Sequence, residues 1–358
     1  MTRRKSTLTV LAGSLLLSAP TLQAAPTDNQ WQAFSKAAVR EHIIPRYQQL
    51  TDSSAQLSAS IAQFCQQPNT SALADTRQQF HNTMAAWQGI QHVQFGPVEI
   101  LMRNFSLQFW PDKKNLTSKQ LNTLLSEENP YNLTPDYFRG ASIAVKGLPA
   151  LERLLFGNAP LSPYGCQLTH AIANNVAMMT ASIDLEWQSQ QLPRIDAAPD
   201  GSDYYEDSTE AATELMKALV EPVEVIRDLK LLRPLHKSAS RAKPRRAESW
   251  RSERSLQNIR LNLAALAEIY RGDNNASVKA LLINEGQSDL AETIDKHFGT
   301  LDTQLAAVKM PLYKAVKDEQ AHQQLRAVSD QLKVLHKELE EAMLALDIQL
   351  GFNSRDGD

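Results

Sequence analysis

The sequence predicts an all-α protein built of two helix bundles. Residues that favour helices, such as Ala, Leu, Gln and Glu, are abundant, whereas Gly accounts for only 13 of 358 residues. Apolar residues recur at helical spacing over long stretches, and no alternating strand pattern competes with them. Residues 192–205 carry Pro193, Pro199 and Gly201 without periodicity, which is typical of a linker. We therefore expect one bundle at residues 26–192 and a second at 206–358, each of the size of a helix bundle.

Residues 1–25 have the pattern of a secretion signal. Arg3, Arg4 and Lys5 form a positive start, and the apolar stretch at 8–19 is too short to span a bilayer. Cleavage after Ala24 or Ala25 removes three cations and takes the formal charge from −3 to −6. No Cys lies near this junction, which argues against a lipoprotein. No later stretch is apolar enough for a transmembrane segment, so we expect a soluble, exported protein.

The chain has two cysteines, Cys65 and Cys166. An even number in an oxidising compartment favours a disulfide between them. In the chain-entropy model, closing a loop of about 100 residues stabilises the fold by roughly 4–5 kcal/mol. Two buried free thiols are the alternative.

In the first part of the chain, helical periodicity covers residues 31–64, 73–90, 117–125, 137–156 and 166–187. Pro45 interrupts the first stretch, so a kink or a short first helix is expected there. Between residues 94 and 115 the periodicity breaks, and aromatic residues alternate with charged ones. Such a stretch often carries a functional site, while packing of the bundle end is the alternative. The residues concerned are Glu99, Arg103, Phe105, Phe109, Trp110 and Asp112.

In the second part, helical patterns cover residues 208–232, 247–270, 278–305 and 319–350. A short acidic run at 203–207 precedes the first of these stretches, and a short basic run at 241–246 follows it. We interpret both as solvated loops. The basic run is too short to indicate nucleic-acid binding, and the negative net charge argues further against it.

Glu152 is the most informative residue of the first part. It lies beside the apolar stripe of residues 144–157, where a carboxylate needs a cationic, hydrogen-bonding or metal partner. Gly147 and Pro149 precede it closely. Because Pro lacks an N–H and restricts the residue before it, the helix that carries Glu152 either starts or bends here.

Residues 245–256 are the most informative stretch of the second part. On a helix, Glu248, Ser252 and Ser255 would align, with Arg251 beside them at the N-terminal end. Backbone donors and the helix dipole favour an anion there. Arg251 could pair with Glu152 or with a ligand carboxylate through two parallel hydrogen bonds. The alternative is a helix start with weak intra-helical ion pairs.

Four motifs in this order resemble the imelysin-like family. They are Gln-Phe-Trp-Pro-Asp-Lys at 108–113, Val-Lys-Gly-Leu-Pro-Ala-Leu-Glu at 145–152, Arg-Ala-Glu-Ser-Trp-Arg-Ser at 246–252 and Gly-Phe-Asn-Ser-Arg-Asp-Gly-Asp at 351–358. The resemblance implies an exported all-α protein of two helix bundles related by internal duplication, with a site in the interdomain cleft. Members are often iron-regulated, and some are classed as M75 metallopeptidases. The resemblance also implies that the terminal motif packs Phe352 and Asn353 near the site. Asp356 and Asp358 supply too few ligands for a calcium loop.

The chain departs from the family motif Gly-x-His-x-x-Glu at one position. Gly147 and Glu152 match this motif, but Pro149 stands where the family has His. Glu152 alone cannot hold a transition metal firmly, and the His-Glu-x-x-His pattern of zinc peptidases is absent. Iron or another divalent metal would need further ligands, such as Glu99, Asp112 or Glu248. Peptidase activity is therefore disfavoured.

We predict a periplasmic protein that binds a small or metal-associated ligand in iron acquisition, with envelope iron-uptake proteins as partners. Glu152 would be the central acceptor, and Phe109 and Trp110 would form the apolar wall. Two alternatives remain, a metal-dependent peptidase and a non-catalytic envelope interaction protein whose motifs only hold the bundles together. The predicted ligand-binding residues are Glu152, Arg103, Trp110, Asp112, Glu248, Arg251, Ser252, Arg254 and Ser255, and Glu152 is also the candidate metal ligand.

Overall fold

The structure, a computed structural model, describes residues 25–157, 160–272 and 276–349. Within these ranges the chain is helical and contains no strand, which confirms the predicted fold class. The signal segment and the C-terminal motif predicted from the sequence lie outside the described residues, apart from residue 25. The α-helices are α1 (Asp28–Ala37), α2 (Ile44–Gln66), α3 (Thr70–Ile90), α4 (Arg103–Leu107), α5 (Leu116–Glu127), α6 (Pro135–Gly140), α7 (Leu148–Leu155), α8 (Pro163–Glu186), α9 (Leu192–Ala197), α10 (Ser208–Val225), α11 (Arg233–Leu235), α12 (Ser255–Arg271), α13 (Val278–Asn284), α14 (Ser288–Ala307), α15 (Leu312–Ala315) and α16 (Glu319–Ala345).

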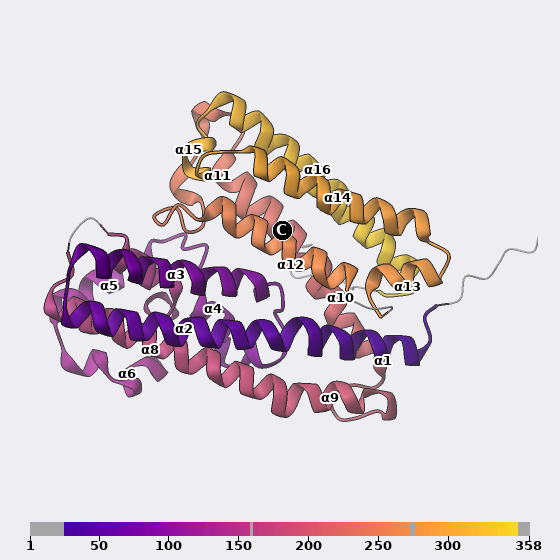
Figure 1. Ribbon diagram of the computed structural model, residues 1–358, viewed down its shortest axis with the longest axis horizontal. Helices are drawn as coiled ribbons and strands as arrows, with labels where there is room; N and C mark the ends of the chain where they lie inside the picture. Colours follow the sequence, from indigo (N-terminus) through magenta and orange to yellow (C-terminus); the bar gives the residue numbers. More distant parts are fainter. Residues whose placement is uncertain (1–24, 158–159, 273–275, 350–358) are drawn as a thin grey trace, which may run out of the picture.

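The N-terminal bundle is built around α2, which packs against both α3 and α8 (Figure 1). Its core positions follow the helical spacing of the sequence, and Leu50, Leu57 and Ile61 on α2 are fully buried. A disulfide joins Cys65, near the end of α2, to Cys166, near the start of α8, with the two Cα atoms 5.6 Å apart. The structure thus contains the disulfide that the cysteine count predicts.

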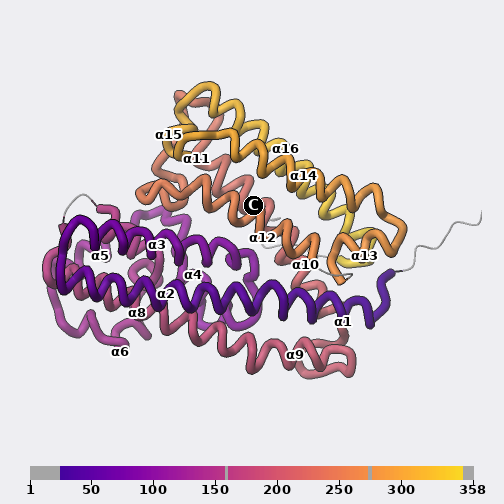
Figure 2. Tube along the Cα trace, in the orientation of Figure 1, coloured from indigo at the N-terminus to yellow at the C-terminus, as the bar shows by residue number. Residues whose placement is uncertain are grey.

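The C-terminal bundle consists mainly of α10, α12, α14 and α16. Helix α14 packs against α16 and α12, and α10 packs against α16. The chain trace in Figure 2 shows these later segments lying above the N-terminal bundle. Helix α12 faces both layers, because it also packs against α3. Residues that directly precede α12 therefore lie at the boundary between the bundles.

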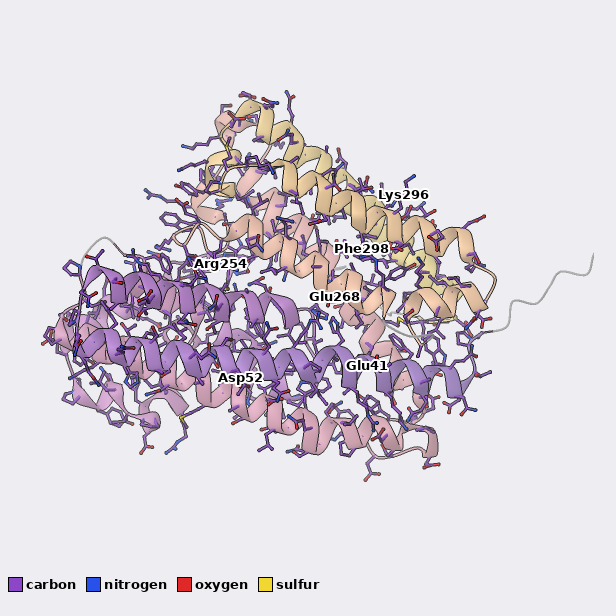
Figure 3. The ribbon with its side chains drawn as sticks, in the orientation of Figure 1. Glu41, Asp52, Arg254, Glu268, Lys296 and Phe298 are labelled. Carbon is purple, nitrogen blue, oxygen red and sulfur yellow. A yellow bond between two sulfur atoms is a disulfide. The ribbon has the colours of Figure 1, made fainter. Side chains whose placement is uncertain are left out.

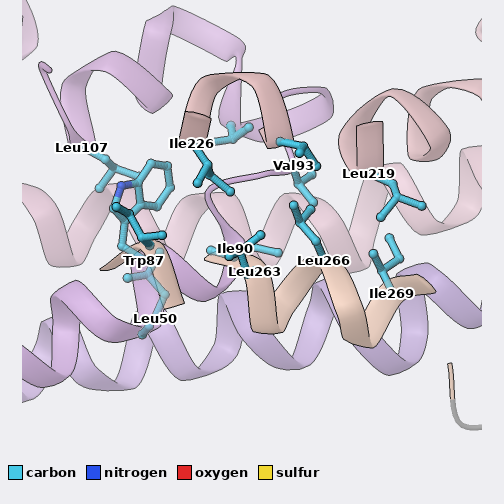
Figure 4. Packing of buried hydrophobic residues seen from close by; sticks show 14 of the residues in the cluster. Leu50, Trp87, Ile90, Val93, Leu107, Leu219, Ile226, Leu263, Leu266 and Ile269 are labelled. Carbon is cyan, nitrogen blue, oxygen red and sulfur yellow. The ribbon is translucent and has the colours of Figure 1, made fainter. Parts of the chain in front are cut away.

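An apolar core continues from one bundle into the other. Figure 4 shows Trp87, Ile90 and Val93 of the N-terminal bundle in the same cluster as Leu263 and Leu266 of α12. All five are at most 4% exposed. Helix α1 also packs against α10 from the other bundle. Because burial of apolar surface on both sides stabilises this arrangement, the bundles hold a defined geometry at their boundary.

Three π-helical turns interrupt the long helices, at Ala38–Ile43, Trp187–Gln191 and Ile226–Leu232. In each case a proline stands two residues after the end of the turn, namely Pro45, Pro193 and Pro234. Proline has no N–H, and its ring clashes with the carbonyl of the residue four positions earlier, so a wider turn accommodates it. Of the two alternatives expected at Pro45, the structure has the short first helix: α1 is 10 residues long, and a π-helical turn joins it to α2.

Two stretches differ from the sequence prediction. Residues 192–205, interpreted as a linker, begin with helix α9 and a 3₁₀ turn at Ala198–Asp200. Residues 247–254, expected on a helix, form consecutive turns, and α12 begins only at Ser255. Ser249 and Glu253 have positive φ values of 47° and 59°, which a right-handed helix cannot contain. The family's internal duplication stays a prediction.

Candidate functional site

A cavity of about 770 Å³ lies at the boundary between the two bundles. Its volume falls within the range of small-molecule sites. Both bundles contribute to its wall, which agrees with the predicted cleft. The N-terminal bundle supplies Phe109, Trp110, Asp112, Lys113, Pro149, Glu152 and Arg153, and the C-terminal bundle supplies Arg233, Arg245, Arg246, Ser249, Trp250 and Arg251.

The helix that carries Glu152 begins at the cavity. Gly147 is the N-cap of α7, and Pro149 lies in the first turn, where its missing N–H is not needed. A side chain at Gly147 would collide with the backbone carbonyls of Ser106 and Leu107, at the end of α4. The glycine therefore permits close packing of α7 on α4, and the helix starts here rather than bends.

Glu152 is held by the other bundle. Its Oε1 accepts hydrogen bonds from the backbone N–H of Ser252 at 2.9 Å and from the Ser252 hydroxyl at 2.7 Å. The carboxyl is only 5% exposed, and burial raises its pKa, although the Ser252 hydrogen bonds and Arg251 act in the opposite direction. The second oxygen, Oε2, has no hydrogen-bond partner among the described residues, and the side chain lines the cavity.

The turn at residues 247–254 positions Ser252 for this contact. The Ser252 hydroxyl also approaches the carbonyl of Ser249 at 3.2 Å, and the N–H of Arg254 donates to the same carbonyl at 3.1 Å. Ser255 donates from its hydroxyl to the carbonyl of Glu248. These local bonds close the turn and aim a backbone donor across the boundary. Ser255 itself is buried and does not line the cavity.

Arg251 and Trp250 also line the cavity. The Arg251 guanidinium lies over the Trp250 ring, with Cζ 4.5 Å from the ring centroid. Burial lowers the pKa of Arg251, while the nearby Glu152 raises it and the cations Arg153 and Arg245 lower it further. The structure thus brings Arg251 near Glu152, but no ion pair joins them within the described residues. The sequence analysis considered Arg251 as a partner of Glu152, but the structure shows that Ser252 donates the hydrogen bonds to this carboxylate.

Glu248 belongs to a separate buried network. Its carboxylate forms an ion pair with Lys230 at 3.0 Å and accepts hydrogen bonds from Gln108 at 2.7 Å and Asn258 at 2.9 Å. Lys230 also donates to three side-chain oxygens, those of Gln88, Gln91 and Asn262, each at 2.7 Å. Every polar atom of this charge pair is satisfied inside the protein. Glu248 therefore does not line the cavity, although the sequence placed it in the site.

Arg103 and Arg254 also lie away from the cavity wall. Arg103 forms a two-point ion pair with Glu186, at 2.6 and 2.9 Å, and donates to the carbonyl of Pro97. Arg254, labelled in Figure 3, approaches the side-chain oxygen of Asn258, and burial lowers its pKa to about 10. Of the three cations predicted for the site, only Arg251 reaches the cavity.

The residues of the cavity do not fit a resident metal ion. No group of three or more His, Cys, Asp or Glu side chains suited to a metal occurs in the described ranges. Asp112 shares the cavity with Glu152, but both of its oxygens accept backbone N–H bonds from Leu116 and Thr117 at the start of α5. A divalent cation needs several free oxygen or nitrogen ligands, and Glu152 offers one side chain.

Four arginines of the cavity wall were not predicted as site residues, namely Arg153, Arg233, Arg245 and Arg246. Arg245 and Arg246 belong to the basic run that the sequence indicated as a solvated loop. The run was visible, but its position over a cavity depends on the fold. Arg233 and the buried Lys230 have no distinctive signal in the sequence, since both follow an apolar helical pattern.

The fold and site together define an all-α protein of two helix bundles with a basic, ligand-sized cavity at their boundary. The sequence model of the imelysin family, peptidase M75, matches residues 43–339, and the chain belongs to this family. None of the described helices is long and apolar enough to cross a membrane.

Known proteins of similar sequence and structure agree with this assignment. The chain is 23% identical over 300 residues to iron-regulated protein A of Synechococcus elongatus, covering 81% of this chain and 78% of the relative. Its fold is similar to the crystal structure of an imelysin-like protein from Psychrobacter arcticum 273-4, with a TM-score of 0.78 at 21% identity. That match covers 92% of this chain and 99% of the other. A structure from Parabacteroides distasonis ATCC 8503 has a TM-score of 0.76 at 14% identity, covering 89% and 96% of the two chains.

Proposed function

We propose that this chain is an exported, periplasmic protein that binds a small or metal-associated ligand in iron acquisition, in the cavity around Glu152. The secretion pattern of residues 1–25 supports the location. The name of the Synechococcus relative, iron-regulated protein A, supports the connection with iron. Envelope proteins of iron uptake would be its partners.

One observation carries the proposal: a buried carboxyl lines a ligand-sized cavity with only one of its two oxygens engaged. Ser252 fixes Oε1 of Glu152 with two hydrogen bonds, so the orientation of Oε2 is set before any ligand arrives. An unsatisfied acceptor in a nearly buried position costs free energy, which a ligand donor would recover. Because the pKa of Glu152 is raised by burial, its carboxyl can also donate when it is protonated.

The remaining walls suit a small ligand. Phe109 and Trp110 offer apolar surface, and Arg251 stacked on Trp250 offers a cation. Asp112 caps α5 and so holds the segment that carries Trp110. A metal in this cavity would therefore arrive as part of the ligand, since the protein does not supply a coordination set.

The test is to identify what the protein carries when it is purified from the periplasm of its own host. Elemental analysis and mass spectrometry of the wild type, Glu152→Gln and the exposed control Asp52→Asn would be compared, after thermal unfolding shows that all three are folded. We expect roughly tenfold less bound ligand in Glu152→Gln, since a hydrogen bond to a charged group is worth about 1.5–3 kcal/mol. Equal amounts of ligand in all three proteins, or none in any, would contradict the proposal.

The family name also carries a peptidase activity, and no observation on the described residues favours it here. Pro149 stands in the first turn of α7, beside Glu152, where the family motif places His. The cavity lacks a metal-binding group within the described ranges, and Ser252 already donates its hydroxyl proton to Glu152. A purely structural role for the motifs predicts that Glu152→Gln changes stability and leaves bound ligand unaltered.

A further inference from the structure

We propose that the ligand of this cavity is a compact polyanion, with two or more carboxylate or phosphate groups, held by a ring of cations. The inference rests on the proposed function and specifies the charge of the ligand. Six cationic side chains line the cavity: Lys113, Arg153, Arg233, Arg245, Arg246 and Arg251. We refer to them as the cation ring.

Within the described part of the chain, carboxylates do not balance the cation ring. Of the carboxylates that the structure describes, two line the same cavity, Asp112 and Glu152, and both already accept hydrogen bonds from the protein. The whole chain carries a formal net charge of −3, so the sign of the cavity is opposite to that of the chain. A concentration of positive charge in a concave surface raises the local concentration of anions.

Among the described residues, the members of the cation ring also have no acidic or hydrogen-bonding side-chain partner. Within the described ranges none of the six forms an ion pair, and none donates a side-chain hydrogen bond. By contrast, Arg103 and Arg227 on neighbouring elements are both paired with carboxylates. In Arg233, Nη1 is shielded from solvent and still has no acceptor in the described structure. Buried donors of this kind are normally satisfied, so a missing acceptor indicates a ligand position.

The cations lie close enough to repel one another. Burial lowers the pKa of Arg233, and Arg246 lowers it further. Burial also lowers the pKa of Arg251. Arg153 and Arg245 lower this pKa further, whereas Glu152 raises it. Like charges held together in a half-buried cavity destabilise the folded state unless a counter-charge is present. A bound polyanion would remove this repulsion and would gain binding free energy from it.

Trp250 arranges two of these cations in advance. The Arg251 and Arg245 Cζ atoms lie 4.5 Å and 5.6 Å from the centroid of its ring. Stacking on an aromatic ring restricts a guanidinium group, so less conformational entropy is lost when it binds. A planar guanidinium matches a carboxylate or phosphate with two parallel hydrogen bonds. Six cations exceed what a single carboxylate needs, which favours a ligand with several anionic groups.

A second groove continues the basic surface outward from the cavity. It shares Arg245, Arg246 and Trp250 with the cavity and adds Lys243, Lys314 and Lys317. This groove would attract anions from a distance and direct them toward the more enclosed cation ring, an effect that falls with ionic strength. The polyanion could be a polycarboxylate, the ferric chelate of one, or a phosphate compound, and the test separates these sources.

The test is isothermal titration calorimetry of the full chain with citrate, ferric citrate and pyrophosphate at low and at physiological ionic strength. The variants are Arg233→Gln and Arg251→Gln, singly and together, with Lys333→Gln as a control that removes one exposed charge from α16. We expect at least one probe to bind the wild type. Each single substitution should weaken that binding about tenfold and the double substitution more, since charge-assisted hydrogen bonds are the strong ones. Lys333→Gln should bind as the wild type does. The probe bound most tightly identifies the source of the anion.

Conservative variants keep the test decisive if a substitution alters folding. Arg233→Lys and Arg251→Lys retain the charge and lose the planar fork, so they should bind between the wild type and the Gln variants. Binding of none of the three probes, or binding equally affected by Lys333→Gln, would overturn the polyanion inference.

Glu152→Gln in the same titration separates this inference from the proposed function. If only Glu152→Gln loses binding, then Glu152 is the acceptor and the cation ring is not involved, which overturns the inference. If only the arginine variants lose binding, then the inference is supported and the role proposed for Glu152 is wrong. Loss in both sets supports both proposals.

Discussion

Two buried glutamates at the same boundary, Glu152 and Glu248, are stabilised in opposite ways. Glu248 is 1% exposed, pairs with Lys230 and accepts two further hydrogen bonds from amide side chains. Glu152 is 5% exposed, has no ion-pair partner in the described structure and binds only Ser252, through one of its oxygens. The two residues are linked by the same turn, at residues 247–254.

This difference separates a structural carboxylate from a candidate ligand-binding one. A buried charge whose partners are complete has no capacity left for a ligand, whereas removing a partner from it is costly. A buried carboxyl with an open oxygen and a cavity beside it keeps that capacity. Glu248 and Lys230 therefore join the bundles, and Glu152 is the better candidate for binding. Each of the following predictions tests this distinction.

The largest effect is expected for Lys230→Met, which leaves Glu248 buried without its counter-ion. Breaking a buried ion pair from one side costs about 3–5 kcal/mol, so the free energy of unfolding should fall by that amount. Urea denaturation at neutral pH measures it. The double variant Lys230→Met/Glu248→Gln should recover part of the loss, because no uncompensated charge remains. A change below about 1 kcal/mol for Lys230→Met would remove the structural role of this pair.

A smaller effect is expected for Ser252→Ala, which removes the hydroxyl donor of Glu152 and keeps the backbone N–H. Loss of one hydrogen bond to a buried carboxylate should lower the free energy of unfolding by about 1–3 kcal/mol. The loss should be greatest at a pH where Glu152 is ionised, so denaturation at pH 8 is compared with pH 5. Ser58→Ala on α2, which removes a hydrogen bond to Asn174 away from the boundary, is the control. An equal loss at both pH values would show that the Ser252 hydroxyl does not stabilise the ionised carboxylate of Glu152.

A still smaller effect is expected for Glu152→Gln, in how its free energy of unfolding changes with pH relative to the wild type. The change should be opposite in sign to ordinary acid denaturation. Burial raises the pKa of Glu152, so the folded state binds the proton more tightly than the unfolded state does. The stabilisation from this group is complete below the ordinary pKa of about 4.5 and is lost as the pH rises through the raised value. Relative to the wild type, Glu152→Gln should therefore become more stable as the pH rises from 4.5 to 8. A difference that is constant with pH would exclude the shifted carboxyl.

The free energy of unfolding of Glu152→Gln should be compared with that of the wild type at each pH. Histidines with lowered pKa values also make the stability of both proteins depend on pH. Burial lowers the pKa of His92 to about 3 and that of His81 to about 4, and it places the pKa of His42 well below 6.5. The unfolded state thus takes up protons first, and both proteins lose stability as the pH falls below about 6.5. Subtracting the wild-type curve from the variant curve removes this common part.

The smallest effect is expected from metal removal. Neither glutamate belongs to a metal-binding group in the described ranges, so a chelator should leave the melting temperature of the purified protein unchanged within about 1 °C. Differential scanning calorimetry with and without EDTA measures this. A decrease of several degrees would show that a resident metal stabilises the fold and would revive the metallopeptidase alternative.

Much of the fold could be predicted from local pattern. The helices of the first and second parts follow apolar residues at helical spacing, and the disulfide between Cys65 and Cys166 follows from the cysteine count. The local structure at the prolines was harder to predict. Pro45 predicts a disturbance, but whether the chain kinks or widens into a π-helical turn depends on what the neighbouring helices can accommodate.

The candidate site was only partly accessible in this way. The requirement that Glu152 have a partner followed from its place beside an apolar stripe, and Arg251 and Ser252 were among the candidates. The sequence placed them on a helix, whereas the structure puts them in a turn with positive φ at Ser249 and Glu253. Residues other than glycine enter that region only when surrounding contacts impose it, so no local pattern announces it.

By itself, the sequence determined that this chain is helical, that it contains the motifs of its family and that residue 152 needs a partner, because these features depend on neighbours along the chain. Tertiary structure alone decided that Ser252 rather than an arginine holds Glu152, that Lys230 neutralises Glu248 and that Arg233, Arg245 and Arg246 surround one cavity. The physical reason is that charges act through space. Their partners come from residues about 20 to 140 positions away, which only the packing of α3, α7 and α12 brings together.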